Sequence, residues 1–592
     1  MTDNKIENRT EKKNRLALII PLVIALAAMC AETVRCFYGI DMGDESFYVS
    51  ESLGLFQGMM PFVEKTNSGV GMSFLLLPVM WIYSMFSPDL SGVILALRLT
   101  FMVFRFAVWL TIFLLLKKHV PSERLMWAML VLAPFTGSCG TSPGLALSYN
   151  TIGALFMLLS GVLLYCAVNE EQGRSYAAKL VSAGFLSGIA VFAHPLQAFT
   201  VITLMTVLFI SEKKGRRFKS VLLYASGGIA EILIVMIPVM AQSGPDALLK
   251  GLGAYVGRKA SMKRDTMETL VSIKAFFLKF WFFMCATFGA AAVFFFAFKK
   301  KLSLEIKDIF MCAAAASAFE GAAFVMLQPY NDMGMPELGA AGMLCMFFTF
   351  FFGKKNRLVY FVSLPCFIFI LLEIFVAATD RPSNRFVFMV PAVWVFVLVL
   401  VTADRKMLLR AACATAVMAL VCELRQFFVF RDLEEGAKLD TKMGSGPYAG
   451  LYTCKEKADQ INALQTYIKD NTDPGDRVAF RDSFSAGYLM SDGLVWADST
   501  WDTLHYFENA NANDYCIYLF EFYQRTGAIP DTVFYVEKSR ATSIDDDSVT
   551  YTDFVKQYYD ETGSREFEGS IKRIRIFTNN GTFDGNLEKW ME

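Results

Sequence analysis

The chain has little histidine, no cysteines at CxxC spacing and no excess of charge of either sign. Its 592 residues include 3 His, and its 12 Cys are scattered without a CxxC pair. The sequence therefore gives no support for zinc, iron–sulfur or His-based metal centres. Lys and Arg number 56, as do Asp and Glu, and no basic stripe runs along the chain. Nucleic acid is therefore not an expected partner.

Apolar residues are abundant instead. They make up 55% of the chain, which has 55 Phe and a mean hydropathy of +0.41. A soluble domain of this size could not bury so much apolar surface, so we predict a polytopic α-helical membrane protein. Apolar runs of roughly 17–25 residues, long enough to cross a bilayer, fall near 16–34, 92–116, 125–140, 150–168, 179–193, 195–211, 220–241, 274–298, 306–327, 338–353, 358–378, 386–402 and 407–424.

One further apolar stretch, 70–86, either crosses the membrane or lies along its surface. Cytoplasmic loops collect Lys and Arg, and the basic clusters all fall on the cytoplasmic side only if this stretch does not cross. We therefore predict about thirteen membrane-spanning helices, a cytoplasmic tail at 1–15 and an external first loop at 35–91. An alternative for the N-terminal run is a cleaved signal peptide.

The composition changes near residue 425. The segment 455–471 carries apolar residues at helical spacing, and 473–476 reads as a turn. Strand-like runs follow at 478–480, 533–536 and 571–577. We therefore predict a membrane module at 16–424 and a C-terminal extracytoplasmic α/β domain at 425–592.

Acidic residues cluster just after the first apolar run, at Asp41, Asp44 and Glu45. Ionised groups beside a bilayer are costly to desolvate, so such a cluster usually has a partner or a function. A solvated acidic loop is the alternative. The predicted external side also holds basic and polar residues that could bind an anionic lipid head group, namely Lys65, Arg258, Lys259, Lys263, Arg264, His194, Tyr330, Arg381 and Arg385.

The first loop also carries a family resemblance. Asp44-Glu45-Ser-Phe-Tyr48 in a long external loop resembles the Asp-Glu-x-x-Tyr motif of the GT-C superfamily of membrane glycosyltransferases. Within it the chain is most similar to the protein O-mannosyltransferase and lipid A aminoarabinose transferase branch. Gly58-Met-Met-Pro-Phe62 and the basic Lys65 match what often follows in that branch, although Thr66-Asn67 replaces its usual Pro-Pro. Arg385-Phe-x₄-Pro391 is similar to the opening of a late span.

The resemblance implies transfer of a sugar from a polyprenyl-phosphate donor to a glycan, lipid or protein acceptor on the extracytoplasmic face, with inversion. It makes Asp44 the expected base and Glu45 the residue that binds or orients the sugar or acceptor, with Asp41 as the alternative for either role and Tyr48 as a substrate-binding residue. Lys65 and the 258–264 cluster are then expected to hold the leaving phosphate, with His194, Tyr330, Arg381 and Arg385 as further substrate-binding candidates. No cofactor is expected, with a divalent metal between Asp41 and Asp44 as the alternative. The expected location is a bacterial cytoplasmic membrane.

Three other functions stay open. A surface-polysaccharide polymerase or ligase would act on related lipid-linked glycans. A lipid or ion-coupled transporter or flippase would normally carry ionisable groups in mid-span and show repeat symmetry. An inactive protein that only binds lipid-linked glycan is the third.

Overall fold

The computed structural model describes part of the chain in detail. The described residues are 19–261 apart from 28, 68, 131 and 133–146, scattered positions between 267 and 300, and residues 349–350, 357–376, 390–402 and 438–591 apart from 482, 502–510, 539–543 and 545–549. Contacts divide the chain into two compact units. The first holds residues 1–36, 101–234 and 264–430, and the second holds residues 37–100, 235–263 and 431–592.

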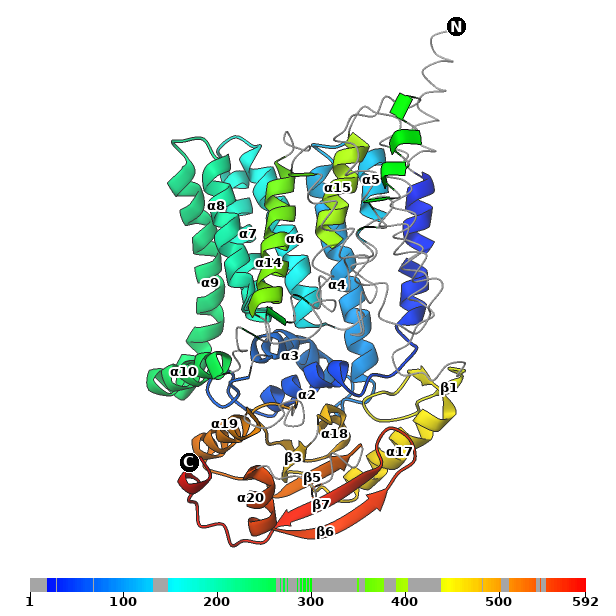
Figure 1. Cartoon of the computed structure of the whole chain (residues 1–592), viewed down its shortest axis with the longest axis vertical. Helices are drawn as coiled ribbons and strands as arrows, with labels where there is room; N and C mark the ends of the chain where they lie inside the picture. Colours follow the sequence, from blue (N-terminus) through cyan, green and yellow to red (C-terminus); the bar gives the residue numbers. More distant parts are fainter. Residues whose placement is uncertain are drawn as a thin grey trace. The chain divides into compact units, whose positions relative to one another are not determined.

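Long apolar helices dominate the described residues before 403 (Figure 1). Four of them are long and apolar enough to cross a membrane, namely α4 (Val93–Leu116), α6 (Tyr149–Val168), α7 (Arg174–Ala193) and α9 (Arg217–Ser243). Shorter apolar helices include α8 (Gln197–Ser211), α14 (Leu358–Val376) and α15 (Val390–Thr402), and α5 (Ser122–Met129) is a short helix of mixed composition. Residues 19–27 and 29–35 are also helical.

These helices confirm most of the predicted apolar runs that the described residues cover, because each helix overlaps the run predicted for it. The helix α5 covers only the start of the run at 125–140. The runs at 306–327 and 407–424 lie outside the described residues, as do most of 274–298 and 338–353. The total of about thirteen spans therefore stays a prediction.

Glycine brings α7 and α9 into close contact. A Cβ built on Gly184 would lie 1.8 Å from the carbonyl oxygen of Tyr224, and one on Gly227 would lie 2.0 Å from a backbone oxygen of α7. Small residues let membrane helices approach in this way. Beside this contact the Tyr224 hydroxyl donates to Ser187 Oγ at 2.7 Å, and Ser187 also bonds Ser160 of α6 at 2.8 Å. The three helices are thus joined by backbone proximity and by buried hydroxyls.

We expect Gly184→Ala to destabilise the first unit, because no helix backbone can yield enough to admit a methyl group at 1.8 Å without separating α7 from α9. Overpacking of this kind costs roughly 1–3 kcal/mol. Gly215→Ala is the matched control, because nothing lies within 4 Å of the Cβ that it would add. Thermal unfolding of the purified protein in detergent measures both, and equal midpoints for the two variants would contradict the close contact.

Two helices lie in the predicted first loop, and both belong to the second unit. They are α2 (Asp44–Phe56) and α3 (Val70–Ser84). The helix α3 covers the apolar stretch predicted at 70–86, and its position on the membrane surface stays a prediction. The helix α10 (Pro245–Ser261) packs on the same loop, because a Cβ on Gly251 would lie 2.0 Å from the Phe62 carbonyl oxygen. The Tyr255 ring lies 6.0 Å from the Phe62 ring.

The tail of the second unit is an α/β domain with one five-stranded sheet, in the order β4-β3-β5-β7-β6. Strands β4, β3 and β5 are parallel, whereas β7 runs antiparallel to both β5 and β6. The strands are β3 (Arg477–Arg481), β4 (Leu494–Val495), β5 (Thr532–Glu537), β6 (Tyr559–Glu566) and β7 (Arg573–Asn579). The tail also contains β1 (Thr441–Lys442), β2 (Tyr452–Thr453), α17 (Lys455–Lys469), α18 (Ser485–Met490), α19 (Asn511–Thr526), α20 (Thr550–Tyr558) and the 3₁₀ turn η5 (Glu588–Trp590).

The predicted elements of this domain are confirmed. The helix expected at 455–471 is α17, and the three strand-like runs fall on β3, β5 and β7. The turn forms as predicted, with Gly475 at φ +100° and the Asp476 amide donating to the Asp473 carbonyl oxygen at 3.1 Å. Whether the domain begins at 425 stays a prediction.

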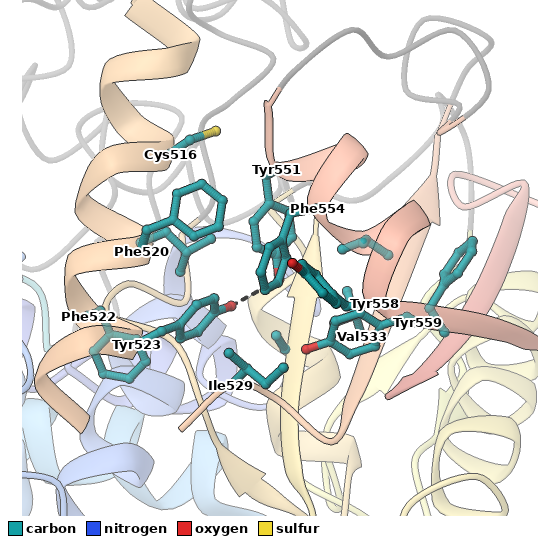
Figure 2. Packing of buried hydrophobic residues seen from close by; sticks show 14 of the residues in the cluster. Cys516, Phe520, Phe522, Tyr523, Ile529, Val533, Tyr551, Phe554, Tyr558 and Tyr559 are labelled. Carbon is teal, nitrogen blue, oxygen red and sulfur yellow. Dashed lines mark hydrogen bonds between the residues drawn. The ribbon is translucent and has the colours of Figure 1, made fainter. Parts of the chain in front are cut away.

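An aromatic core packs α19 and α20 against the sheet (Figure 2). The Tyr523 and Tyr551 hydroxyls bond each other at 2.9 Å, and Phe554 stacks on the Tyr551 ring. The same cluster includes Leu55 and Met59 from the end of α2 and the loop after it. The tail therefore shares its hydrophobic core with the first loop.

An ion pair fixes the start of the parallel strands. Arg477 Nε and Nη2 donate to the two carboxylate oxygens of Asp531 at 2.9 and 2.5 Å. Partial burial raises the pKa of the Asp531 carboxyl, but the hydrogen bonds and charge of Arg477 outweigh that effect and hold the pKa below its usual value.

Candidate functional site

The predicted acidic cluster lies at the start of α2. Asp44 and Glu45 occupy its first turn, where unpaired backbone amides and the helix dipole favour negative charge. Asp41 precedes the helix, and its Oδ1 accepts the Gly43 amide at 2.8 Å. This hydrogen bond makes a local turn that sets the direction in which α2 begins.

Glu45 is held by Arg98, a charged residue within the apolar run at 92–116. Arg98, near the start of α4, donates from Nε to Oε1 at 2.7 Å and from Nη2 to Oε2 at 2.6 Å. Nη1 donates to the Tyr38 carbonyl oxygen at 3.2 Å, and Nη2 also donates to the Gly39 carbonyl oxygen at 3.0 Å. Both charged side chains are buried. A bidentate pair of this kind fixes geometry, so Glu45 acts here as an anchor for the start of α2.

Asp44 differs from its two acidic neighbours in exposure. Glu45 is 3% exposed and Asp41 is 8% exposed, whereas Asp44 is half-buried. A general base must reach a proton on its substrate. Of the three predicted carboxylates, Asp44 is therefore the best placed to meet a substrate. Tyr48, one turn further along α2, is buried, with its ring 5.2 Å from that of Phe47.

A second buried ion pair lies farther along α2. Lys65 Nζ lies 3.0 Å from Glu51 Oε2, and both side chains are fully buried. Asn67 Nδ2 donates to the same oxygen at 2.9 Å, and the Thr500 amide donates to Glu51 Oε1. Gly54 makes room for the lysine, because a Cβ there would lie 2.7 Å from Lys65 Cε. The structure thus gives the Lys65 ammonium a carboxylate partner, and its predicted phosphate contact stays a prediction.

Tail residues extend this polar network. Asp498 Oδ1 accepts the Thr66 amide at 2.7 Å, and the Asp498 carbonyl oxygen accepts Asn67 Nδ2 at 2.5 Å. Arg525 of α19 lies 3.9 Å from the Asp498 carboxylate and donates to the Glu64 carbonyl oxygen at 3.3 Å. Thr66 and Asn67, which stand where the branch that the first loop resembles usually has Pro-Pro, therefore bind the tail.

The Gly58-Met-Met-Pro-Phe62 stretch forms a tight turn between α2 and Lys65. Gly58 has φ +106° and Phe62 has φ +61°, and the Glu64 carboxylate accepts the Met60 amide at 2.7 Å. A non-glycine residue at positive φ is strained, and such strain persists only where the surrounding structure holds it. Phe62 is held by the contact with α10, the helix that carries the predicted basic residues Arg258 and Lys259.

The other predicted site residues are not all brought together. His194 caps the end of α7 in the first unit, buried between the rings of Tyr149 and Phe369 at 5.2 and 5.1 Å. A structural role in ring packing accounts for that position. Arg264, Tyr330, Arg381 and Arg385 lie outside the described residues.

Sequence reasoning missed Arg98, Glu51 and Asp498. Arg98 could have been found, because a charge inside an apolar run calls for a buried partner, and the acidic cluster of the preceding loop offers one. Glu51 and Lys65 flank the glycine-proline turn with opposite charges, which is a weaker signal. Nothing in the sequence pointed to Asp498, which lies 432 positions from its partner Thr66. Within the described ranges no group of three or more His, Cys, Asp or Glu side chains could hold a metal ion.

No family model and no curated protein matches the chain. Solved structures do resemble it. An oligosaccharyltransferase of Archaeoglobus fulgidus, in complex with zinc and sulfate, has a TM-score of 0.47 at 14% identity over 95% of this chain and 73% of its own. ArnT of Cupriavidus metallidurans, bound to undecaprenyl phosphate, has a TM-score of 0.44 at 10% identity over 95% and 98%. Both are GT-C superfamily membrane glycosyltransferases. At these TM-scores no residue role passes from those proteins to this chain.

We expect Glu51→Gln to destabilise the second unit by about 3–5 kcal/mol, because it leaves the Lys65 ammonium buried without a counter-charge. Adding Lys65→Met should recover part of that loss, because the double variant buries no unpaired charge. The control is Lys469→Met, which removes an exposed pair with Asp492 and should cost less than about 1 kcal/mol. Denaturant or thermal unfolding in detergent reports all three, and a Glu51→Gln effect no larger than the control would refute the structural role.

Proposed function

We propose that the protein is a membrane glycosyltransferase that moves a sugar from a polyprenyl-phosphate donor to an acceptor on the extracytoplasmic face. The acceptor is a glycan, a lipid or a protein. One observation carries the proposal: at the start of α2, Glu45 and Asp41 are buried, whereas Asp44 between them is only partly buried. That is the arrangement of one accessible carboxylate on a fixed support that base catalysis needs.

In this proposal Asp44 accepts the proton of the acceptor hydroxyl while the oxygen of that hydroxyl attacks the anomeric carbon. The new oxygen–carbon bond forms as the bond between the anomeric carbon and the phosphate oxygen breaks, and polyprenyl phosphate leaves with the electron pair. Attack and departure take opposite faces of the sugar, so the configuration inverts. Arg98 and Glu45 hold the start of α2 so that Asp44 keeps its place during the reaction.

Cations are needed where the phosphate leaves. Arg258 and Lys259 are our first candidates, because α10 packs against the same loop that α2 leads into. Arg264, Arg381 and Arg385 are further candidates. Lys65 ranks below them, since its ammonium already lies 3.0 Å from Glu51. The isoprenoid tail of the donor would lie among the apolar helices.

A transporter or flippase is the second candidate, and one observation favours it. Glu231 lies in the middle of α9, is 2% exposed, and has an oxygen without a hydrogen-bond partner, against Gly188 of α7. Ionisable groups in mid-span are typical of transport pathways. A phosphate-releasing activity that depends on Asp44 and survives Glu231→Gln would exclude a role for Glu231 in this chemistry.

The catalytic test is Asp44→Asn, which keeps size and hydrogen bonding but removes the proton acceptor. We expect release of polyprenyl phosphate from polyprenyl-phosphate sugars to fall roughly 100- to 10,000-fold, with donor binding retained. Asp246→Asn is the matched control, since Asp246 is an exposed carboxylate in the first turn of another helix of the same unit. Lipid chromatography of the products gives the rates. Near wild-type turnover by Asp44→Asn would rule out Asp44 as the base.

A labelling experiment tests the proposed orientation. The first loop and the tail share hydrogen bonds, so both must lie on one side of the membrane, and an even number of crossings must separate them. Twelve of the roughly thirteen predicted spans follow the loop, which meets that condition. Single cysteines at 87–89 and at exposed tail positions should react with an impermeant maleimide added outside, and cysteines at 213–215 should not. Reaction of cysteines at 213–215 would show that the orientation is opposite to the proposed one.

A further inference from the structure

The tail segment 493–501 runs along α2 in the opposite direction to the helix. At the end of α2, Gln57 donates to the Gly493 carbonyl oxygen at 3.1 Å and accepts the Val495 amide at 2.8 Å. The side-chain amide thus binds the short strand β4 as a neighbouring strand would. One end of the segment is thereby fixed to the last residues of the helix.

Thr500 fixes the middle of α2. Its amide donates to Glu51, and Ser50 Oγ donates to its hydroxyl at 2.7 Å. Its carbonyl oxygen accepts Ser485 Oγ from α18, also at 2.7 Å. Every polar group of this residue is thus engaged, and all three hydrogen bonds are buried. The position of the next residue, Trp501, is therefore set by the buried ion pair of α2.

Trp501 lies at the start of α2. Its ring is 5.7 Å from that of Phe47, with an angle of 73° between them. Two of its ring carbons lie 3.9 Å from the place that a Cβ on Gly43 would occupy, and Gly43 directly precedes Asp44. Both aromatic rings are half-buried. The tail therefore places an aromatic side chain, partly open to solvent, beside the proposed base.

We propose that Trp501, supported by Phe47, is a platform for the sugar ring of the lipid-linked donor. The inference rests on the proposed function and names what the tail adds to that site. One face of a pyranose presents C–H groups, which stack on an aromatic ring with burial of apolar area on both sides. Indole is the largest of the aromatic amino-acid side chains and so offers the largest face for such a contact.

The donor sugar fits this position better than a remote part of an acceptor. The anomeric carbon must lie within bonding reach of the hydroxyl whose proton Asp44 takes. The sugar that carries this carbon is therefore next to the start of α2 during the reaction, and Trp501 flanks that start. An acceptor needs to bring only one hydroxyl there.

The experiment compares lipids with and without a sugar. Affinities of the full-length protein in nanodiscs are measured for undecaprenyl phosphate, undecaprenyl-phosphate glucose and undecaprenyl-phosphate mannose. The wild type should bind at least one sugar-bearing lipid more tightly than undecaprenyl phosphate. Trp501→Ala should weaken that binding about five- to twentyfold and leave the affinity for undecaprenyl phosphate unchanged. Trp501→Phe, which keeps an aromatic face, should stay within about threefold of the wild type.

Trp496→Phe is the control, because Trp496 lies in the same segment but donates its indole N–H to the Ala528 carbonyl oxygen at 3.0 Å. It should bind all three lipids as the wild type does. The platform is overturned if the sugar adds no affinity in the wild type, if Trp501→Ala weakens all three lipids equally, or if it changes only the KM for acceptor. Loss of the proposed function has a different signature: no binding of undecaprenyl phosphate by the wild type, or an active Asp44→Asn.

Discussion

The second unit depends on the ion pair and hydrogen bonds that the buried carboxylate of Glu51 makes. It receives an ammonium and an amide from the first loop and a backbone amide from the tail, all without access to water. Each of these groups would be costly to bury alone. The helix α2, the loop after it and the tail therefore stabilise one another only when all three are in contact. Because Glu51 lies on the helix that begins with Asp44, the same carboxylate that joins the loop to the tail also fixes the proposed base.

Two buried ion pairs therefore act on one helix. The pair between Arg98 and Glu45 holds its first turn, and the pair between Lys65 and Glu51 holds its middle. A helix anchored by charge at two points resists rotation about its own axis as well as sliding. That restraint suits a base which must meet a substrate in a single geometry, since small displacements of a reacting group cost much of the rate.

The sequence predicted regular elements well and the polar network poorly, for physical reasons. The helix α17 and the strands β3, β5 and β7 bury apolar residues at their own periods, so the pattern is local and readable. The sequence predicts a loop where α2 forms, because serines and carboxylates occupy half of the buried positions of this helix. Several of them have partners far away in the chain, namely Arg98, Tyr448 and Thr500. The edge strand β6 was missed because seven of its eight residues are at least partly exposed and it lacks an apolar alternation.

The hydrogen bond between Thr500 and Glu51 also has a consequence for how the chain is made. The two residues lie 449 positions apart. During synthesis the first loop emerges with Glu51, Lys65 and Asn67 before the residues that complete their network exist. Until the tail is translated, these groups must stay hydrated or be shielded by another protein. The contact of α2 with Thr500 can therefore form only late in translation, and a chain that stops before residue 500 would carry the acidic motif without this support from the tail.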